Sequence, residues 1–131
     1  MEKLTCNIFA PFTSWSNYGE KGRRFTHDLL KIYKDWNINL VNYVTDHTRD
    51  GYIDLDLIPL INGGVESPDV CITIGYPTIF QEGGKVNIGV VDSCDVCNEE
   101  DEKLYIVHCN RMNALIVYSD YTKETLMNLE L

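Results

Sequence analysis

The segment Val70-Cys-Ile-Thr-Ile74 indicates the fold class most directly, because every residue in it except Cys71 is β-branched. Continuous runs of this kind are typical of parallel strands that are buried on both faces. A second β-prone run, Val86-Asn-Ile-Gly-Val-Val91, follows a pair of glycines at 83–84. Further short runs lie at residues 6–10, 39–45 and 114–118. The sequence therefore predicts a sheet of several short strands.

Helical patterns separate these strands. Apolar residues recur at helical spacing at Phe25, Leu29, Ile32, Tyr33 and Trp36. Asn98 is a good N-cap followed by acidic residues, and Ser119 is expected to cap a last helix that begins near Tyr121. For the helix after Asn98 we expect a buried face made of Leu104, Val107, His108 and Met112. Residues 46–67 give no clear pattern.

This alternation predicts an α/β, Rossmann-like three-layer domain with a mainly parallel sheet covered by helices on both faces. The chain of 131 residues is expected to form this single domain over its whole length, 1–131. Ligands of such sheets bind at the carboxyl ends of the strands. We therefore expect the site near the loops that follow Ala10, Ile74 and Val91.

Composition excludes several classes of partner. The formal net charge of −9 repels phosphate backbones, so we expect no nucleic acid partner. The sequence contains no signal-peptide pattern and no apolar run long enough to span a membrane. The five cysteines, in a chain without such a signal, favour reduced thiols and a cytoplasmic location.

The segment from Asn17 to Arg24 is the strongest candidate for a ligand site, and we expect it to be a polar loop before the first helix. Gly19 and Gly22 would allow close approach of the backbone, and the following helix N-terminus favours anions. Arg23 and Arg24 would add contacts to a phosphate or a carboxylate, with Tyr18 beside them. The alternative is a flexible, solvated basic turn without a ligand.

Other polar residues are weaker candidates. His27 and His47 are isolated histidines, and either is a possible base or simply a surface residue; His27 lies close to this segment, and His47 follows the second predicted strand. Asp92 follows a strand and is suited to bind a sugar hydroxyl. Cys94-Asp-Val-Cys97 precedes a helix, where a redox or metal role competes with a structural one. A zinc site would have to add His108 and Cys109 to this cysteine pair. Because these two residues are adjacent on a helix and point about 100° apart, they cannot both bind one tetrahedral ion, and we predict no metal site.

A longer pattern in the second half of the chain resembles a known family. The strand Val86-Asn-Ile-Gly-Val-Val91 is followed by Asp-Ser, an acidic helix and the stretch Cys109-Asn-Arg-Met-Asn-Ala-Leu-Ile-Val-Tyr-Ser-Asp-Tyr-Thr-Lys123. This order resembles the N-terminal lobe of two-lobed (GT-B) glycosyltransferases. The matching positions are Met112, Asn113, Ser119, Tyr121 and Lys123. Pro68-Asp-Val and the glycine-containing segment 18–24 also resemble elements of that lobe.

The resemblance implies an acceptor-binding domain that also forms part of a nucleotide-sugar cleft. A nucleotide-sugar would be the co-substrate, no cofactor or metal would be needed, and the partner would be a small-molecule or glycan acceptor. Gly19, Gly22 and the arginine pair would shape the donor-phosphate side, and Asp92 would meet the acceptor. Catalytic residues are not assigned, and the chain is not expected to be active alone, because the C-terminal donor lobe of such enzymes does not follow Leu131.

Two other classes of function remain open from the sequence. The chain is alternatively a non-catalytic binding or assembly domain that keeps the fold without the donor lobe. Its apolar surface would then pair with another chain, either by self-association or with the missing lobe. A nucleotide or small-molecule sensor that uses the same strand edge is a third possibility.

Overall fold

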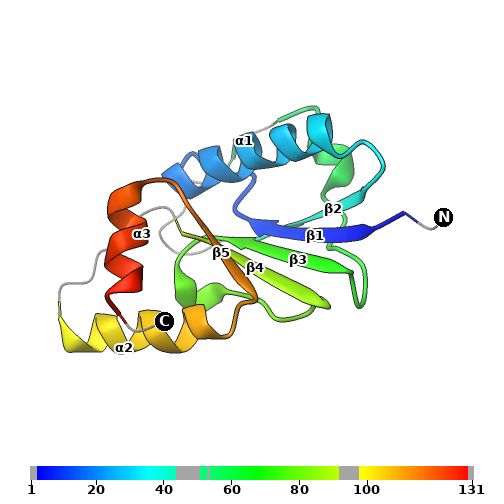
Figure 1. The fold of residues 1–131 in the computed structure, drawn as a ribbon. Helices are drawn as coiled ribbons and strands as arrows, with labels where there is room; N and C mark the ends of the chain where they lie inside the picture. The colour runs from blue at the N-terminus through cyan, green and yellow to red at the C-terminus, as the bar shows by residue number, and fades with distance from the viewer. Residues whose placement is uncertain (1–2, 44–50, 53, 92–97, 130–131) are drawn as a thin grey trace.

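A computed structural model describes residues 3–43, 51–52, 54–91 and 98–129 (Figure 1). Strands and helices alternate along the chain in the order β1 (Thr5–Ala10), α1 (Asn17–Ile32), β2 (Asn37–Asn42), η1 (Ile58–Leu60), β3 (Val70–Ile74), η2 (Pro77–Ile79), β4 (Val86–Val91), α2 (Glu99–Asn110), β5 (Ala114–Val117) and α3 (Asp120–Met127). All neighbouring strands are parallel, and they form one sheet in the order β2-β1-β3-β4-β5. The predicted α/β, Rossmann-like three-layer fold is confirmed.

The sheet has a different core on each face. In the strand register Ile8 lies beside Ile72 and Ile72 beside Ile88, so these side chains share one face. That face packs against Phe25, Leu29 and Leu30 of α1 and is called the α1 face. The other core contains Phe80, Val91, Tyr105, Cys109, Leu126 and Leu129. Figure 1 shows α1 and α2 on opposite sides of the sheet, with α3 near the carboxyl ends of the strands.

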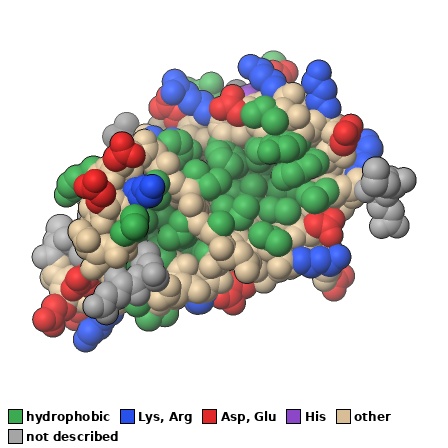
Figure 2. Space-filling model, viewed as in Figure 1, with side chains coloured by type: hydrophobic (Ala, Val, Ile, Leu, Met, Phe, Trp, Pro, Cys, Tyr) green, Lys and Arg blue, Asp and Glu red, His purple; other side chains and the backbone are tan. Residues whose placement is uncertain are grey.

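The α1 face is only partly covered. The helix α1 packs over β1 and β3, whereas Val86 of β4 is 43% exposed and Ile116 of β5 is 37% exposed. The strand register places both residues on the α1 face, because Val86 pairs with Val70 and Ile116 with Val90. Figure 2 shows hydrophobic side chains gathered over the strands beside α1. We call Val86, Ile88 and Ile116 the open apolar strip.

Several local predictions are confirmed by the structure. The strands β3 and β4 have the predicted bounds. Asn98 caps α2 by accepting a hydrogen bond from the Asp101 amide, and Ser119 caps α3 by accepting one from the Thr122 amide. These caps explain why both helices begin where they do, since each side chain satisfies an amide that has no partner within its helix.

The predicted loop at 17–24 is wrong, because these residues form the first turns of α1. The helix begins at Asn17 because Ser16 caps it, its side chain accepting a hydrogen bond from the Gly19 amide. The helix also ends earlier than the apolar spacing indicates, at Ile32. Tyr33 and Trp36 instead stack on each other beyond its end, with ring centroids 4.2 Å apart.

The predicted buried face of α2 is wrong in part, since Met112 packs against the core but Leu104 and Val107 do not lie on the buried side. Leu104 and Val107 are 39% and 56% exposed, whereas Tyr105 and Cys109 are buried. Tyr105 is the larger of the two buried side chains, and its ring packs edge-on against Tyr76, with ring centroids 5.5 Å apart. Apolar residues lie on several sides of this helix, so their spacing alone does not identify the side that packs on the sheet.

Within the described residues, no helix combines the length and the apolar character that crossing a bilayer requires.

Candidate functional site

A cleft lies where the loop after β1 meets the segment that follows β2. The amides of Gly51 and Tyr52 both donate to the Thr13 carbonyl, each at 2.8 Å, and join the two segments. Asn42 at the end of β2 strengthens the junction, because its side chain bonds both the amide and the hydroxyl of Thr13. The cleft has a volume of about 440 Å³ and is lined by Trp15, Glu20, Arg23, Arg24, His27, Tyr52 and Asp54.

Aromatic side chains form one wall of the cleft. Trp15 is 61% exposed and packs edge-on against Tyr52, with ring centroids 4.6 Å apart and an interplanar angle of 86°. The guanidinium of Arg23 lies 3.9 Å from the centroid of the Tyr52 ring, a distance typical of a cation–π contact. A fixed and solvent-accessible tryptophan face offers a platform for a flat or ring-shaped ligand.

The two arginines of the predicted site have different environments. Arg23 is buried, and its Nη1 donates to the carbonyl oxygens of Phe12 at 3.0 Å and Ser14 at 2.6 Å. It therefore holds the loop after β1 in place. Arg24 is exposed, and its Nη2 forms an ion pair with Glu20 Oε1 at 3.0 Å, one helical turn away. Of the pair, Arg24 is the one that presents its charge to solvent.

The two glycines of the predicted site lie at close contacts within the fold. A Cβ on Gly19 would overlap the carbonyl oxygen of Ser14 and lie 2.9 Å from that of Pro11. A Cβ on Gly22 would lie 2.6 Å from the Cβ of Ala10. Both positions therefore need glycine for packing of α1 against β1 and its loop, and their predicted contact with a ligand stays a prediction.

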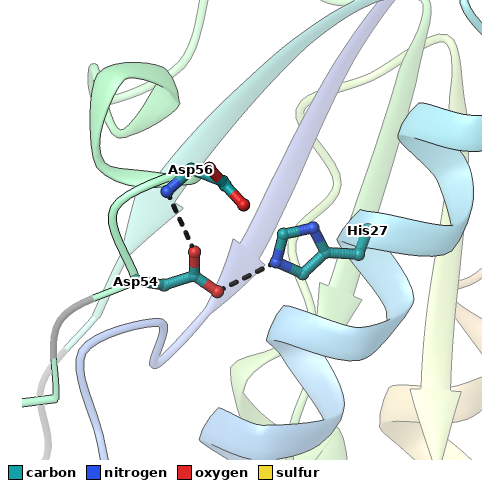
Figure 3. A group of neighbouring side chains, drawn as sticks. All are labelled: His27, Asp54 and Asp56. Atoms are coloured by element: carbon teal, nitrogen blue, oxygen red, sulfur yellow. Dashed lines mark hydrogen bonds and ion pairs between the residues drawn. The ribbon is translucent and has the colours of Figure 1, made fainter.

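His27 is paired with a carboxylate across the cleft. Its Nε2 lies 2.9 Å from Oδ2 of Asp54, and the two side chains are 35% and 19% exposed. Figure 3 shows the imidazole projecting from α1 toward the segment that carries Asp54 and Asp56. Partial burial is the largest influence on the pKa of Asp54 and raises it. The hydrogen bond and the charge of His27, with the amides of Asp56 and Leu57, outweigh burial and hold the pKa below its usual range.

The sequence identified His27 as a possible base but not its partner. Asp54 lies 27 residues away, within the segment 46–67 that showed no clear pattern. The one local signal is the alternation of acids in Asp54-Leu-Asp56. Such an alternation is common on exposed loops, so only the fold shows that both acids lie near an imidazole.

Tyr18 lies apart from the cleft, close to the carboxyl ends of the central strands. Its neighbour Tyr43 donates a hydrogen bond of 2.7 Å from its phenol to the Ile74 carbonyl at the end of β3. Burial raises the pKa of Tyr43, and the nearby Tyr18 raises it further. Tyr18 therefore lies at the edge of the sheet where parallel α/β folds bind ligands.

The remaining candidate residues, and the other cysteines, have the following places in the structure. Asp92, His47, Cys94 and Cys97 lie outside the described residues. Three other cysteines, Cys6, Cys71 and Cys109, are buried and form no disulfide among the described residues. Burial, reinforced by the neighbouring Cys71, raises the pKa of Cys6 to about 12, so this thiol is inert at neutral pH.

The cleft combines an exposed tryptophan, two carboxylates and an imidazole held by one of them. This set suits a ligand with a ring and several hydroxyl groups, because the ring stacks and the hydroxyls bond to carboxylate oxygens. Comparison of the chain with protein-family models, curated proteins and solved structures gives no significant match. The cleft and the fold are therefore the basis for assigning a function.

Proposed function

We propose that this chain is the N-terminal, acceptor-side domain of a glycosyltransferase-like protein and that the cleft beside α1 binds the acceptor. The observation that carries the proposal is the His27–Asp54 hydrogen bond of 2.9 Å beside an exposed Trp15. A base that is oriented by a carboxylate, in a cleft that also contains an exposed aromatic ring, is suited to activate the hydroxyl of a bound sugar.

In this proposal the acceptor ring stacks on Trp15, and one hydroxyl approaches the imidazole of His27. Asp54 accepts a hydrogen bond from Nε2–H, so Nδ1 is the nitrogen with a free lone pair. As the acceptor oxygen bonds to the anomeric carbon of the donor, the bond from that carbon to the diphosphate breaks. The hydroxyl proton passes to the imidazole, and the imidazolium is stabilised by Asp54.

The donor in this proposal is a nucleotide-sugar, which the chain contacts only in part. Arg24 presents the one guanidinium of the pair that is exposed, so it is the better candidate for a phosphate contact. Tyr18, at the carboxyl ends of the strands, lies where a nucleotide would approach the sheet. The contacts of Gly19, Gly22, Arg23 and Asp92 to substrate remain predictions.

The experiment is a backbone amide NMR titration of the labelled chain with a panel of sugars, oligosaccharides, free nucleotides and nucleotide-sugars. Acceptor binding should shift amides around Trp15, His27 and Asp54. Trp15→Ala should weaken that binding by about two- to tenfold, since stacking on an aromatic ring contributes on the order of 0.5–1.5 kcal/mol. Leu55→Ala is the matched control, because Leu55 is 80% exposed and does not line the cleft.

Two outcomes would contradict the proposal. One is the absence of shifts at the cleft with every sugar tested. The other is equal weakening by Trp15→Ala and Leu55→Ala, which would indicate a nonspecific effect.

The open apolar strip favours a second candidate, an assembly domain that pairs with a second copy of itself. Val86 and Ile116 remain substantially exposed on a sheet face that helices usually cover in this type of fold. A two-fold contact would place the same strip of each copy against the other. Sedimentation velocity should then show a dimer that Ile116→Lys converts to monomer; a monomer at all concentrations would exclude this candidate.

A further inference from the structure

We propose that His27, Asp54 and Asp56 form a binding site for a transition-metal dication, for which Zn²⁺ is the best-suited ion. The three residues offer one donor atom each, and these atoms all lie within 4.8 Å of one another. The inference does not depend on the proposed acceptor site, because it concerns metal binding by the chain itself.

The spacing of the His27 and Asp54 donor atoms is close to what a tetrahedral ion needs, and the Asp56 donor lies within 4.8 Å of both. Two ligand atoms at about 2.1 Å from zinc lie about 3.4 Å apart. His27 Nε2 and Asp54 Oδ2 are 2.9 Å apart, so they must separate by only about half an ångström. The ion then replaces the proton that the two atoms share, and a carboxylate oxygen of Asp56 supplies the third ligand.

The acidic segment is held in place before any ion binds. Oδ1 of Asp54 accepts a hydrogen bond of 3.1 Å from the Asp56 amide, and the Asp54 carbonyl accepts bonds from the amides of Leu57 and Ile58. The imidazole projects from the rigid helix α1. Figure 3 shows the Asp56 carboxylate directed toward the same space as the imidazole. Among the described residues, no donor is bonded to that carboxylate.

The charge around the site also favours a cation. The chain has a formal net charge of −9, which raises the local concentration of cations. Of the two nearby arginines, Arg24 opposes this only weakly because it is paired with Glu20, whereas Arg23 is bound to uncharged backbone carbonyls and keeps its positive charge. An imidazole ligand selects zinc over magnesium or calcium, which prefer oxygen donors alone.

Metal binding has a consequence for the cleft. His27 and Asp54 both line it, so an ion with these three ligands borders the cleft and retains one position for water or a ligand. With the ion on Nε2, the neutral imidazole carries its proton on Nδ1, so His27 can act as the proposed base only in the metal-free chain.

The test is isothermal titration calorimetry of Zn²⁺ into the full chain, repeated with Mg²⁺. We expect one equivalent of zinc and no competition from magnesium. Asp56→Asn and His27→Gln should each weaken zinc binding by at least about tenfold, the loss that even removal of an outer-shell partner commonly causes. Asp28→Asn is the matched control, because it removes an exposed carboxylate next to His27 in the sequence but outside the cluster.

A cobalt titration distinguishes this site from the cysteines. Co²⁺ bound by His27, Asp54 and Asp56 should show visible ligand-field bands without a sulfur-to-metal charge-transfer band. Absence of zinc binding, or zinc binding that neither Asp56→Asn nor His27→Gln weakens, would overturn the proposal. A cobalt spectrum dominated by sulfur would do the same. Because Asp56 is exposed, Asp56→Asn should fold normally, and far-ultraviolet circular dichroism checks this for both variants.

Discussion

At the residue scale, the glycines of α1 show how packing can override helix propensity. Alanine is favoured over glycine by about 1 kcal/mol within a helix, so Gly19→Ala would stabilise an isolated α1. In the folded chain, however, its Cβ would overlap the Ser14 carbonyl oxygen and crowd that of Pro11. Both obstacles are backbone atoms, which cannot turn aside as a flexible side chain can.

We therefore expect Gly19→Ala to lower the free energy of unfolding by about 1–3 kcal/mol, as overpacking of a well-packed site usually does. Urea denaturation followed by circular dichroism measures the change. Gly83→Ala is the matched control, because a Cβ there meets nothing within 4 Å. A more stable Gly19→Ala variant would mean that the loop after β1 relaxes without cost.

At the scale of elements, Asp69 ties together the amino ends of three strands. Asp69 directly precedes β3. Its Oδ2 accepts hydrogen bonds from the amide and the hydroxyl of Thr5, the first residue of β1, and its Oδ1 pairs with Lys85, which directly precedes β4. The Thr5 amide, the Lys85 ammonium and the Thr5 hydroxyl, in that order, lower the pKa of Asp69 below its ordinary value. A lowered pKa in the folded state means stabilisation above the ordinary pKa, and this is lost as pH falls through the folded value.

Asp69→Asn should therefore lower the free energy of unfolding at pH 7. The free energy of unfolding of the variant should also fall less than that of wild type as the pH is lowered. Urea denaturation of both proteins at several pH values between about 3 and 7 tests this, since the range spans the ordinary pKa of aspartate. The gap between wild type and variant should narrow as the pH falls. A gap that stays constant across the range would show that the charge of Asp69 is not responsible.

The N-cap of α2 provides a second prediction at this scale. Asn98→Ala removes the acceptor for the Asp101 amide and should cost about 1 kcal/mol of stability. Thermal denaturation measures the loss. Asn98→Asp retains an acceptor and should preserve most of the stability. No loss for Asn98→Ala would mean that the side-chain cap contributes nothing to stability.

The elements that the sequence predicted best are those whose signal is local. All residues of the strand Val70–Ile74 except Cys71 are β-branched, and Asn98 and Ser119 each cap the amide three residues ahead. The start of α1 was missed because Gly19 and Gly22 are typical of loops, and the Ser16 cap was not recognised. The pairing of His27 with Asp54 cannot be predicted from the sequence, because it depends on how the segment after β2 returns to α1.

At the scale of the whole molecule, the sheet separates two cores that both depend on a few large side chains. Phe80 is 2% exposed and lies over Gly89 of β4, where a Cβ would overlap its ring. Phe80→Ala should lower the free energy of unfolding by about 3–5 kcal/mol, because it removes a buried ring and leaves a cavity. That is a large part of the total stability of a domain of this size.

Chemical denaturation of Phe80→Ala beside Leu55→Ala measures this contribution. Leu55 is 80% exposed, so its truncation should change stability little. A small loss for Phe80→Ala would mean that Tyr105 and the neighbouring side chains collapse into the space.

The central position of β1 has a consequence for biosynthesis. During synthesis β1 emerges before both of its neighbours, β2 on one side and β3 on the other, and Cys6 meets Val70 only after more than sixty further residues have been added. In a nascent chain β2 can therefore pair with one edge of β1 early, whereas the other edge stays unpaired until β3 has been translated. Parallel pairing over such separations is slow, so the time between translation and sheet closure is when this chain is most exposed to aggregation.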